Sequence, residues 1–485
     1  MRNLLLIIAL VGVPCSPLLA ATLVVPTDHE TVADALDSAQ AGDTVLIQPG
    51  NHKAVGLLLP DGVSLRGNGA DPSQTILDGQ LSGRILTCES QTTMPTIENL
   101  TFRKGRAQGP TSYDGSGGAI LCSNGDVLIR DCRFEDNEAQ DHGGAIRSSH
   151  ASPRIENCVF IGNVAAGGGG ALDCSYGSDP TVGASMFQAN SAAWGGAVSC
   201  RAQSSPRLEN CVLDGNTAAG SPGLGGAVFS DYEAHPVLVQ TTLCDNEAKN
   251  GGAAASLEAS GLSLETCTLA GNTAMSQGGG LFLSGATASV AASVISFNEG
   301  KSLHLQDAAQ SEISCTDIYG NTGGDWVLEI KAQKNDPGNL DVDPLYCTLE
   351  PGDPARFAPR KDSPLLAVQE LCGQLGAMPV GCAASAVGGS LPAMAVAGLA
   401  AHPNPFNPRT SINFELTRDA HVRVKVHDLH GAVVRQLADT ALTAGSHSLS
   451  WNGVDAVGRA LAAGTYLVVA EANGEQLVTK VALIK

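Results

Sequence analysis

The fold of this chain is decided by a nine-residue string, IRDCRFEDN at residues 129–137, which returns in altered form at regular intervals. It reads IENCVFIGN at 155–163, LENCVLDGN at 208–216 and LETCTLAGN at 264–272. The Asn that closes each string belongs to a longer column with spacings of 26, 27, 26, 30, 26, 26 and 23 residues: Asn137, Asn163, Asn190, Asn216, Asn246, Asn272, Asn298 and Asn321. Such regularity indicates one structural unit stacked many times.

A second string, Gly-Gly-Ala followed by an apolar residue, lies between these copies at 117–120, 143–146, 169–172, 195–198 and 225–228. Within each unit, short apolar stretches alternate every second residue and are separated by Gly, Asn, Ser and Pro, which is typical of strands and turns. A unit of about 26 residues cannot bury its own inward face, whereas stacked coils can. We therefore predict an all-β chain built on a parallel β-helix, with equivalent positions about 4.8 Å apart.

Two columns of small residues are expected to be structural. One holds Cys132, Cys158, Cys211 and Cys267 together with Ser185, Thr241 and Ser293, and the other holds Cys122, Cys174 and Cys200 with Ser148 and Ser230. Because Cys exchanges only with Ser and Thr, we interpret these columns as small buried slots. Stacked side chains point the same way, which disfavours disulfides, and no His or acid interleaves to form a metal site. The Asn column is expected at a turn, since Asn tolerates left-handed conformations and its amide can bond along a stack.

The amino terminus predicts export. Arg2 precedes an apolar run at residues 4–13, and small residues follow up to Ala20 and Ala21, so residues 1–20 are interpreted as a signal peptide. Residues 29–50 are expected to form a short amphipathic helix, stopped by Gly42, and then a strand. That helix would cap the open edge of the first coil. The β-helix domain is expected to span residues 21–382, with insertions at 336–359 closing its far end.

Charge and cysteine content restrict the partners and the cross-links. The formal net charge of −20 disfavours nucleic acid, because a phosphate backbone is held by clustered Lys and Arg. Three cysteines, Cys347, Cys372 and Cys382, lie outside the regular columns. In an exported chain Cys372 and Cys382 are expected to close a loop, which leaves Cys347 over, although the sequence does not fix this pairing.

The composition changes after Cys382. Residues 383–401 are small and contain Gly and Pro, which indicates a linker. Residues 402–485 contain several short alternating segments, including Ile412, Phe414 and Leu416, which predict a small Ig-like β-sandwich. Four histidines there show no ligand spacing, so a solvated face is expected rather than a metal site: His421, His427, His430 and His447.

The repeats and the carboxyl-terminal module each resemble a known family. Residues 23–382 resemble the right-handed parallel β-helix proteins, and the paired GGA and FEDN, FIGN and FQAN strings resemble the repeats of polymorphic outer membrane proteins. That resemblance implies a surface-exposed, adhesin-like domain, although the chain lacks that family's carboxyl-terminal β-barrel. The predicted β-helix, a single chain wound into coils, also resembles pectate lyases and polygalacturonases. Their chemistry does not follow from a shared fold.

The strings PNPFNP, VHDLHG, AGSHSLSWNG and GTY, with the terminal Lys485, resemble the type IX secretion sorting domain and the Ig-like domain of flagellar hook-capping proteins. This resemblance implies a type IX-like secretion machinery as a partner. It also implies a location at the cell surface or outer membrane, or outside the cell. The sandwich would then act as the sorting signal that directs the β-helix to its location.

One flank of the β-helix is expected to carry function. Counting outward from the GGA strings places a mixed set of charged and aromatic side chains within a few coils of one another: Arg147, His150, Asp173, Tyr176, Arg201, Asp231 and Tyr232. We interpret this set as a binding patch for an extracellular polysaccharide, a host or matrix surface, or another cell surface. One alternative is a polysaccharide lyase or glycoside hydrolase, for which Asp173 and Asp231 would be the paired acids. Another is a structural surface-layer component that associates with itself and has no discrete ligand. No cofactor is expected, and a calcium ion would enter only with a lyase.

Overall fold

The computed structural model describes residues 20–274, 278–327, 329–350, 353, 356–381, 396–404, 406–416, 419–428, 433–472 and 475–484. Nearly all of the predicted signal peptide and most of the predicted linker lie outside these residues, as do Cys382, His430 and Lys485. Among the described residues, no helix is both long and apolar enough to cross a membrane.

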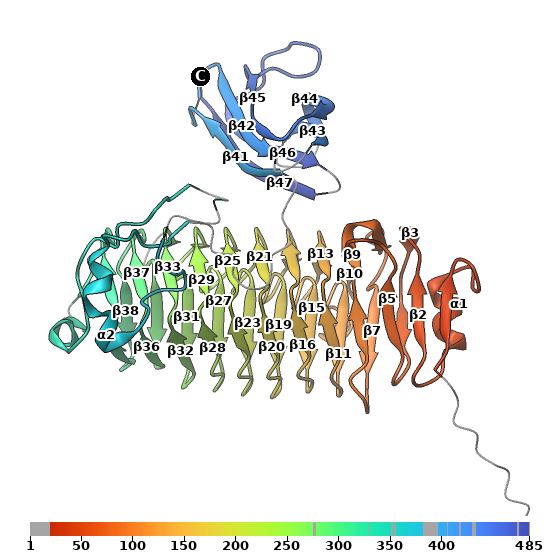
Figure 1. Ribbon diagram of the computed structural model, residues 1–485, viewed down its shortest axis with the longest axis horizontal. Coiled ribbons are helices and arrows are strands. Elements are labelled where there is room, and N and C mark those ends of the chain that lie inside the picture. The colour runs from red at the N-terminus through yellow and green to blue at the C-terminus, as the bar shows by residue number, and fades with distance from the viewer. Residues whose placement is uncertain are drawn as a thin grey trace, which may run out of the picture.

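The amino-terminal part is a parallel β-solenoid of about eleven coils, and the all-β prediction is confirmed (Figure 1). Three long sheets run along the solenoid. The first has 12 strands, from β1 (Thr22–Val25) to β39 (Gln310–Ser314), and the second has 11, from β3 (Gly50–Lys53) to β40 (Asp317–Tyr319). The third has ten strands and carries the predicted patch. A fourth sheet consists of seven two-residue strands, from β10 (Arg106–Ala107) to β34 (Thr273–Ala274).

A coil in the middle of the solenoid contributes one strand to each of the four sheets. In the coil that carries the first quoted string, the order is β11 (Ile120–Ser123), β12 (Leu128–Arg130), β13 (Arg133–Glu135) and β14 (Glu138–Ala139). Successive coils pair in register, so equivalent residues stack, as Phe134 does on Phe160. Ring centroids along the column Phe102, Phe134, Phe160 and Phe187 lie 5.1, 4.7 and 4.6 Å apart. In-register stacking turns each apolar position of the repeat into a continuous core column.

The Asn column forms a buried ladder inside the solenoid. The Nδ2 of Asn163 donates to Oδ1 of Asn190 at 2.9 Å and to the Phe134 carbonyl at 3.0 Å, and the neighbouring Asn residues repeat this pattern. The left-handed backbone lies one residue earlier, at Asp136 and Ala189 with φ of 51° and 53°, rather than at the Asn itself. That preceding residue makes the turn, which leaves the amide free to point inward along the stack.

The cysteine columns are buried, and their members are free thiols. Cys132, Cys158, Cys211 and Cys267 each direct the thiol toward a backbone carbonyl of their own turn at 3.2–3.4 Å. Burial raises the pKa of Cys211 and Cys267 to about 12. A thiol with such a pKa stays protonated at neutral pH, which disfavours both metal binding and disulfide exchange.

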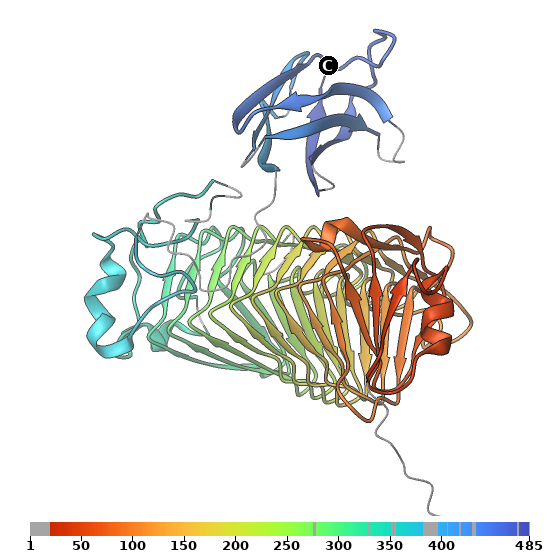
Figure 2. The same cartoon turned by 45° about the vertical axis from the view of Figure 1, so that its right-hand side comes forward.

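Different structural elements cover the two ends of the solenoid (Figure 2). Helix α1 (Val32–Ser38) begins at Thr31, whose hydroxyl accepts a hydrogen bond from the Asp34 amide at 3.1 Å, and it buries Val32, Ala35 and Leu36. The helix ends at Ser38, four residues before Gly42, so the predicted stop at Gly42 is wrong. At the other end Trp326 and Ile330 close the core, followed by the 3₁₀ helix η2 (Lys331–Asn335).

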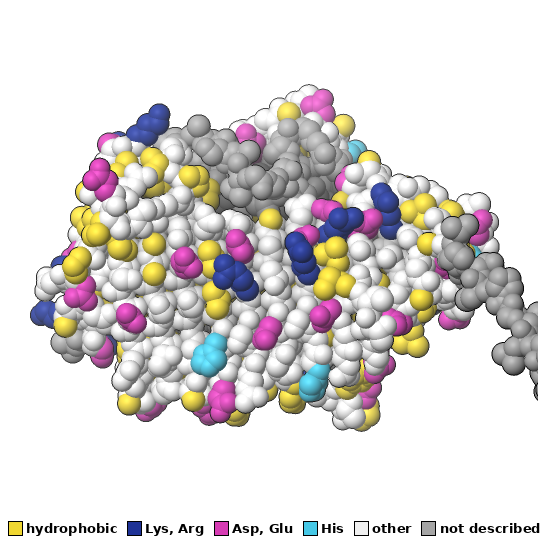
Figure 3. All heavy atoms as spheres, turned by 60° about the horizontal axis from the view of Figure 1, so that its bottom comes forward, with side chains coloured by type: hydrophobic (Ala, Val, Ile, Leu, Met, Phe, Trp, Pro, Cys, Tyr) yellow, Lys and Arg dark blue, Asp and Glu magenta, His cyan; other side chains and the backbone are white. Residues whose placement is uncertain are grey.

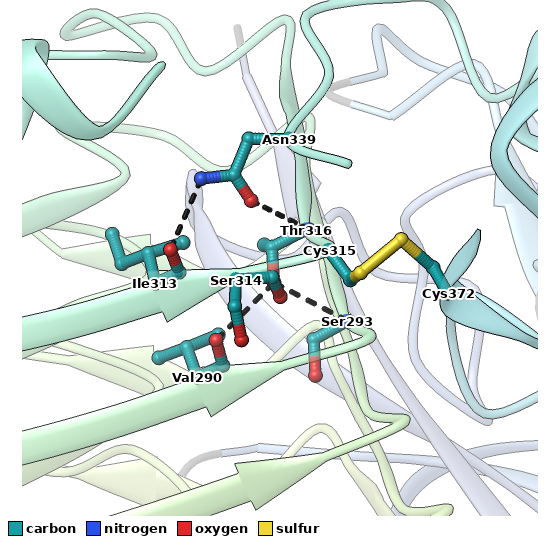
Figure 4. The surroundings of a disulfide bond; sticks show 8 residues. All are labelled: Val290, Ser293, Ile313, Ser314, Cys315, Thr316, Asn339 and Cys372. Atoms are coloured by element: carbon teal, nitrogen blue, oxygen red, sulfur yellow. Dashed lines mark hydrogen bonds between the residues drawn. A yellow bond between two sulfur atoms is a disulfide. The ribbon is translucent and has the colours of Figure 1, made fainter. Parts of the chain in front are cut away.

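Residues 340–381 return along the second sheet and are cross-linked to it. Cys315 forms a disulfide with Cys372, which is the last residue of α2 (Gln369–Cys372) (Figure 4). The predicted pairing of Cys372 with Cys382 is therefore wrong, and Cys347 is also disulfide-bonded rather than left over. The cause is local: Cys315 occupies a turn position with φ of 49°, next to the buried Thr316, so its sulfur points away from the core.

Residues 396–484 form two small antiparallel sheets. One contains β41 (Val396–His402), β42 (Thr410–Leu416) and β45 (Gly445–Trp451), and the other contains β44 (Val433–Leu442), β43 (Ala420–His427), β46 (Gly464–Ala472) and β47 (Glu475–Leu483). The alternating residues of β42 and β43 are buried, and the core includes Phe406, Trp451 and Tyr466. His421 is exposed and lies 3.5 Å from Asp439, while His447 is half-buried and lies 2.7 Å from the Thr443 carbonyl.

Candidate functional site

The predicted patch lies on the third sheet, where three outward columns run side by side. The strands in order along the sheet are β4 (Leu57–Leu59), β7 (Leu86–Glu89), β11, β15 (Ile146–Ser149), β19 (Leu172–Ser175), β23 (Val198–Arg201), β27 (Val228–Asp231), β31 (Ala254–Leu257), β35 (Leu281–Ser284) and β38 (Leu303–Gln306). Because residues alternate across a strand, the first and third residues of each strand from β11 to β38 face the core. The second residues form what we call the covered column, the fourth the rim column, and the residues just after the strands the turn column.

The covered column is buried. It contains Leu121, Arg147, Asp173, Ser199, Phe229, Ala255 and Phe282, and it pairs in register from coil to coil. Arg147 is 6% exposed and Asp173 is 1% exposed, so the prediction that this column is an exposed stripe is wrong. The loops that precede the Gly-Gly-Ala strings fold over it. A Cβ at Gly168 would lie 2.3 Å from Trp194 Nε1, so glycine is what allows this loop to approach.

The charged members of the covered column bind one another. Arg147 Nη1 donates to the hydroxyls of Ser112 and Ser116 at 2.9 and 2.8 Å, and its Nε lies 3.7 Å from Asp173 Oδ2. The Asp173 carboxylate also accepts hydrogen bonds from Ser199 at 2.5 Å and Ser175 at 3.3 Å. These hydrogen bonds tie Arg147 to Ser112 and Ser116 of the covering loop, and they tie Asp173 to Ser175 and Ser199 of the strands beneath it. Neither side chain reaches solvent where a substrate would lie.

The turn column is exposed and contains flat side chains. Its members are Asn124, His150, Tyr176, Ala202, Tyr232 and Glu258, all with φ between 45° and 59°. Tyr176 is 55% exposed and Tyr232 is 50% exposed. His150 and Tyr176 are stacked, with ring centroids 5.4 Å apart and planes 4° apart. Left-handed backbone is unfavourable for a bulky residue, and strained positions of this kind concentrate at functional sites.

Arg201 of the rim column joins the aromatic side chains. Its guanidinium carbon lies 5.6 Å from the Trp194 ring centroid and 5.3 Å from that of Tyr232. Arg201 Nε and Trp194 Nε1 are buried nitrogens without a hydrogen-bond partner among the described residues. Trp194 was not predicted as a site residue, although one of only three Trp residues directly precedes a Gly-Gly-Ala string. Arg201, Tyr232 and Trp194 therefore form one cluster with two unused hydrogen-bond donors.

Asp231 and Asp173 are not brought together as a catalytic pair. Asp231 belongs to the rim column, where its Oδ1 accepts a hydrogen bond from the Tyr232 amide at 2.8 Å. Burial, and then the nearby Glu258, raise the pKa of Asp231. Asp173 lies in the covered column beneath the loops. One carboxylate is thus beside the exposed rings while the other is committed to Ser199 and Arg147.

A separate cleft of about 610 Å³ lies between the first sheet and residues 69–72. Its charged lining residues are Arg66, Asp71, Glu98, Arg130, Asp131 and Arg133. Glu98 bridges Arg66, at 3.2 Å, and Arg130, while Arg133 pairs with Glu135 at 2.8 Å.

Figure 3 shows how charged side chains are distributed on one face, where acidic side chains are dispersed and Lys and Arg lie close to acids. Across the described residues, no group of three or more His, Cys, Asp or Glu side chains is arranged to hold a metal ion.

Two family models match parts of the chain. Residues 75–229 match the right handed beta helix region, and residues 404–476 match the FlgD Ig-like domain. No curated protein matches the chain.

Among solved structures, the chain is similar to the catalytic domain of a GH87 alpha-1,3-glucanase in complex with nigerose, at 12% identity and a TM-score of 0.26. A substituted form of that domain in complex with tetrasaccharides gives 10% identity and a TM-score of 0.25. In both cases the match covers 68% of this chain and 69% of the other. At these scores the likeness carries no inference about activity.

Proposed function

We propose that this chain is a secreted protein that is displayed at the cell surface, where the solenoid flank binds a glycan or another surface. The observation that carries the proposal is the turn column of the third sheet. A chain with only 19 aromatic residues places two Tyr and one His at exposed, left-handed positions. There the rings add nothing to the core, and Tyr, Trp and Arg are the residue types that dominate binding hot spots.

The proposal includes a role for the carboxyl-terminal module. Its match to an Ig-like domain and its closing strings support a sorting function through a type IX-like secretion machinery, with the cell surface or the outer membrane as destination. The polymorphic-outer-membrane-protein-like repeats support display of the solenoid as an adhesive surface. In this proposal the sandwich determines location and the solenoid determines what is bound.

The burial of Asp173 favours binding over catalysis. Hydrolysis of a glycosidic bond needs two carboxyl groups that both reach the substrate. Asp173 is bound to Ser199, Ser175 and Arg147 beneath the loops, so it cannot act with Asp231 as the predicted pair of acids. We therefore keep turnover as an outcome of the test and not as the proposed activity.

The experiment measures binding and chain-end release together. The full chain is labelled and added in increasing concentration to intact cells and to immobilised neutral and acidic polysaccharides. Saturable binding without new reducing ends or unsaturated uronides is expected. Release of chain ends would replace the proposal with a hydrolase or lyase, and the absence of any saturable binding would refute it.

The sorting role of the carboxyl-terminal module is tested separately in the producing cell. Cells that express the full chain are fractionated beside cells whose chain stops at residue 395, before β41 begins. The full chain is expected at the outer surface, and the shortened chain inside the outer membrane. Equal surface amounts of the two chains would contradict a sorting role for residues 396–485.

A further inference from the structure

We infer that the turn column binds one sugar ring of a neutral, linear polysaccharide between Tyr176 and Tyr232. This inference rests on the proposed binding function and names its ligand class and position. The space concerned lies above Ala202, one coil from each tyrosine, and we call it the Ala202 interval. Four observations lead to it, from the backbone outward.

The first observation is the spacing of the rings. Backbone hydrogen bonds join neighbouring coils at the turn, from Gly177 N to the Ala202 carbonyl at 2.9 Å and from Gln203 N to the Tyr232 carbonyl at 3.0 Å. Tyr176 and Tyr232 are thus two coils apart, a separation of roughly 10 Å, twice the spacing of neighbouring strands. Between them the turn column has only the methyl group of Ala202, and the guanidinium of Arg201, from the same coil, lies over the Tyr232 ring. That separation suits one saturated ring in contact with an aromatic face.

The second observation is the orientation of Tyr176. His150 of the preceding coil covers one face of its ring, with the two planes 4° apart. The opposite face is therefore turned toward the next coil, which is that of Ala202. An aromatic face attracts the C–H bonds of a pyranose ring, because the face carries the negative side of the ring quadrupole. A sugar that enters the Ala202 interval would place its apolar face on Tyr176.

The third observation is the arginine beside the interval. Arg201 comes directly before Ala202 and is half-buried, and its guanidinium carbon lies 5.3 Å from the Tyr232 ring centroid. A guanidinium carries five N–H donors and no acceptor, so it suits a ligand that brings oxygen acceptors. Sugar hydroxyls combine such acceptor oxygens with the apolar face that Tyr176 requires.

The fourth observation is the charge around Arg201, which selects a neutral sugar. Asp231 follows in register, and the exposed Glu233 and Glu258 lie just beyond it, with Glu233 held by Gln203 at 2.9 Å. The net charge of the whole chain is −20. A polyuronate would meet one partly committed arginine among three acids and would be repelled. A protein partner would need about 800 Å² of complementary surface, far more than these rings offer.

The test measures affinities of the full chain for soluble linear oligosaccharides by calorimetry. The panel contains neutral glucan, mannan and galactan fragments, with oligogalacturonate as the acidic comparison. At least one neutral fragment is expected to bind saturably and more tightly than the acidic one. Tyr176→Ala and Tyr232→Ala are each expected to weaken that binding about tenfold.

Ala202→Tyr distinguishes a ring held in the interval from a sugar lying across exposed rings. Tyrosine fits this position because Tyr176 and Tyr232 have the same backbone conformation in adjacent coils. If the sugar enters the interval, Ala202→Tyr fills it and weakens binding at least as much as Tyr176→Ala. Tyr113→Ala is the matched control, since Tyr113 is 40% exposed and also lies under an arginine, Arg84, at 5.6 Å. The affinity of the Tyr113→Ala variant for the neutral fragment is expected to stay within about twofold of that of the unchanged chain.

The outcomes separate this inference from the proposed function. Glycan binding that survives Tyr176→Ala, Tyr232→Ala and Ala202→Tyr would leave the binding function intact and overturn the position. Stronger binding by Ala202→Tyr, or preference for oligogalacturonate, would overturn the interval or the ligand class respectively. Adhesion to cells without binding to any fragment would overturn this inference alone. Circular dichroism of each variant verifies that the solenoid is folded.

Discussion

The covered column and the turn column of the third sheet lie a few residues apart in every coil, yet they use their side chains in opposite ways. The covered column buries charged groups, Arg147 and Asp173, that sequence inspection places at a surface. The turn column exposes Tyr176 and Tyr232, although aromatic residues are scarce in this chain. The difference shows that on a solenoid a charged residue is no guide to function until the loops above it are known.

Between the covered and turn columns, the largest expected effect comes from removing one partner of the buried pair. Asp173→Ala leaves Arg147 as an unpaired buried cation, and we expect the free energy of unfolding to fall by about 3 kcal/mol. Urea denaturation followed by circular dichroism measures this. Glu258→Ala, in the exposed turn column, is the control and should change stability by less than about 0.5 kcal/mol. Equal effects of the two substitutions would mean that the covered column is open to water.

The buried Asn ladder can be compared in the same way with an exposed Asn. Asn190 donates to the Phe160 carbonyl and Asn216 Oδ1, and it accepts from Asn163, all within 3.1 Å. Asn190→Ala leaves those buried groups without partners, so a loss of about 2 kcal/mol is expected in the same assay. Asn51→Ala, at an exposed position of β3, should be nearly neutral. A neutral Asn190→Ala would show that the ladder contributes little to stability.

Asp317 is a buried acid that, unlike Asp173, has no cationic partner among the described residues, and its titration makes the stability of the fold depend on pH. Burial raises the pKa of Asp317 to about 8, and Asp325, Asp341 and Asp343 act in the same direction, while the Val342 amide donates to it and opposes the shift. The folded state therefore keeps a proton that the unfolded chain releases near pH 4. Stability from this group is complete below about pH 4 and declines as the pH rises toward 8, on the order of 1 kcal/mol per pH unit.

Denaturation at pH 5, 7 and 9 measures this slope in the unchanged chain and in Asp317→Asn. The Asn variant has no proton to lose, so its slope between pH 5 and 8 should be smaller. An identical slope in both chains would assign the pH dependence to other groups, such as Asp136, whose pKa burial raises to about 6.

The smallest expected change in stability is at the exposed column. Tyr176→Asn places a residue that tolerates left-handed backbone at a position with φ of 59°, so unfolding should shift by less than about 0.5 kcal/mol. Phe187→Ala, in the buried ring column, is the reference and should lose several kcal/mol. Thermal denaturation compares the two. A large loss from Tyr176→Asn would show that the exposed rings serve the fold.

Much of the fold was predictable because the spacing of the repeated strings shows which residues of successive coils pair with one another. The Gly-Gly-Ala and Asn strings located the coils, and in-register stacking then placed the two small-residue columns and the Asn column. The disulfide was not predictable. Cys315 is one residue away from the buried Thr316 in a regular coil, and only the return of residues 340–381 brings Cys372 to it.

The candidate site was predictable only in part, because the period says which residues share a column but not what covers a column. His150 stacks on Tyr176 and Arg201 lies over Tyr232, whereas Arg147 and Asp173 are closed off by loops of differing length. Trp194 was missed because it belongs to such a loop, and its contact with Arg201 crosses between two columns.

The amino-acid sequence by itself determined the stacked coils, the Asn and Cys columns and the alternating strands of the carboxyl-terminal sandwich. It could do so because these features follow from local periodicity and from pairing between identical neighbours. Only the tertiary structure decided that the Arg147 column is buried, that the Tyr176 column is exposed and that Cys315 bonds Cys372. Those outcomes depend on where irregular loops and the returning tail come to rest, which involves contacts between segments that share no repeat.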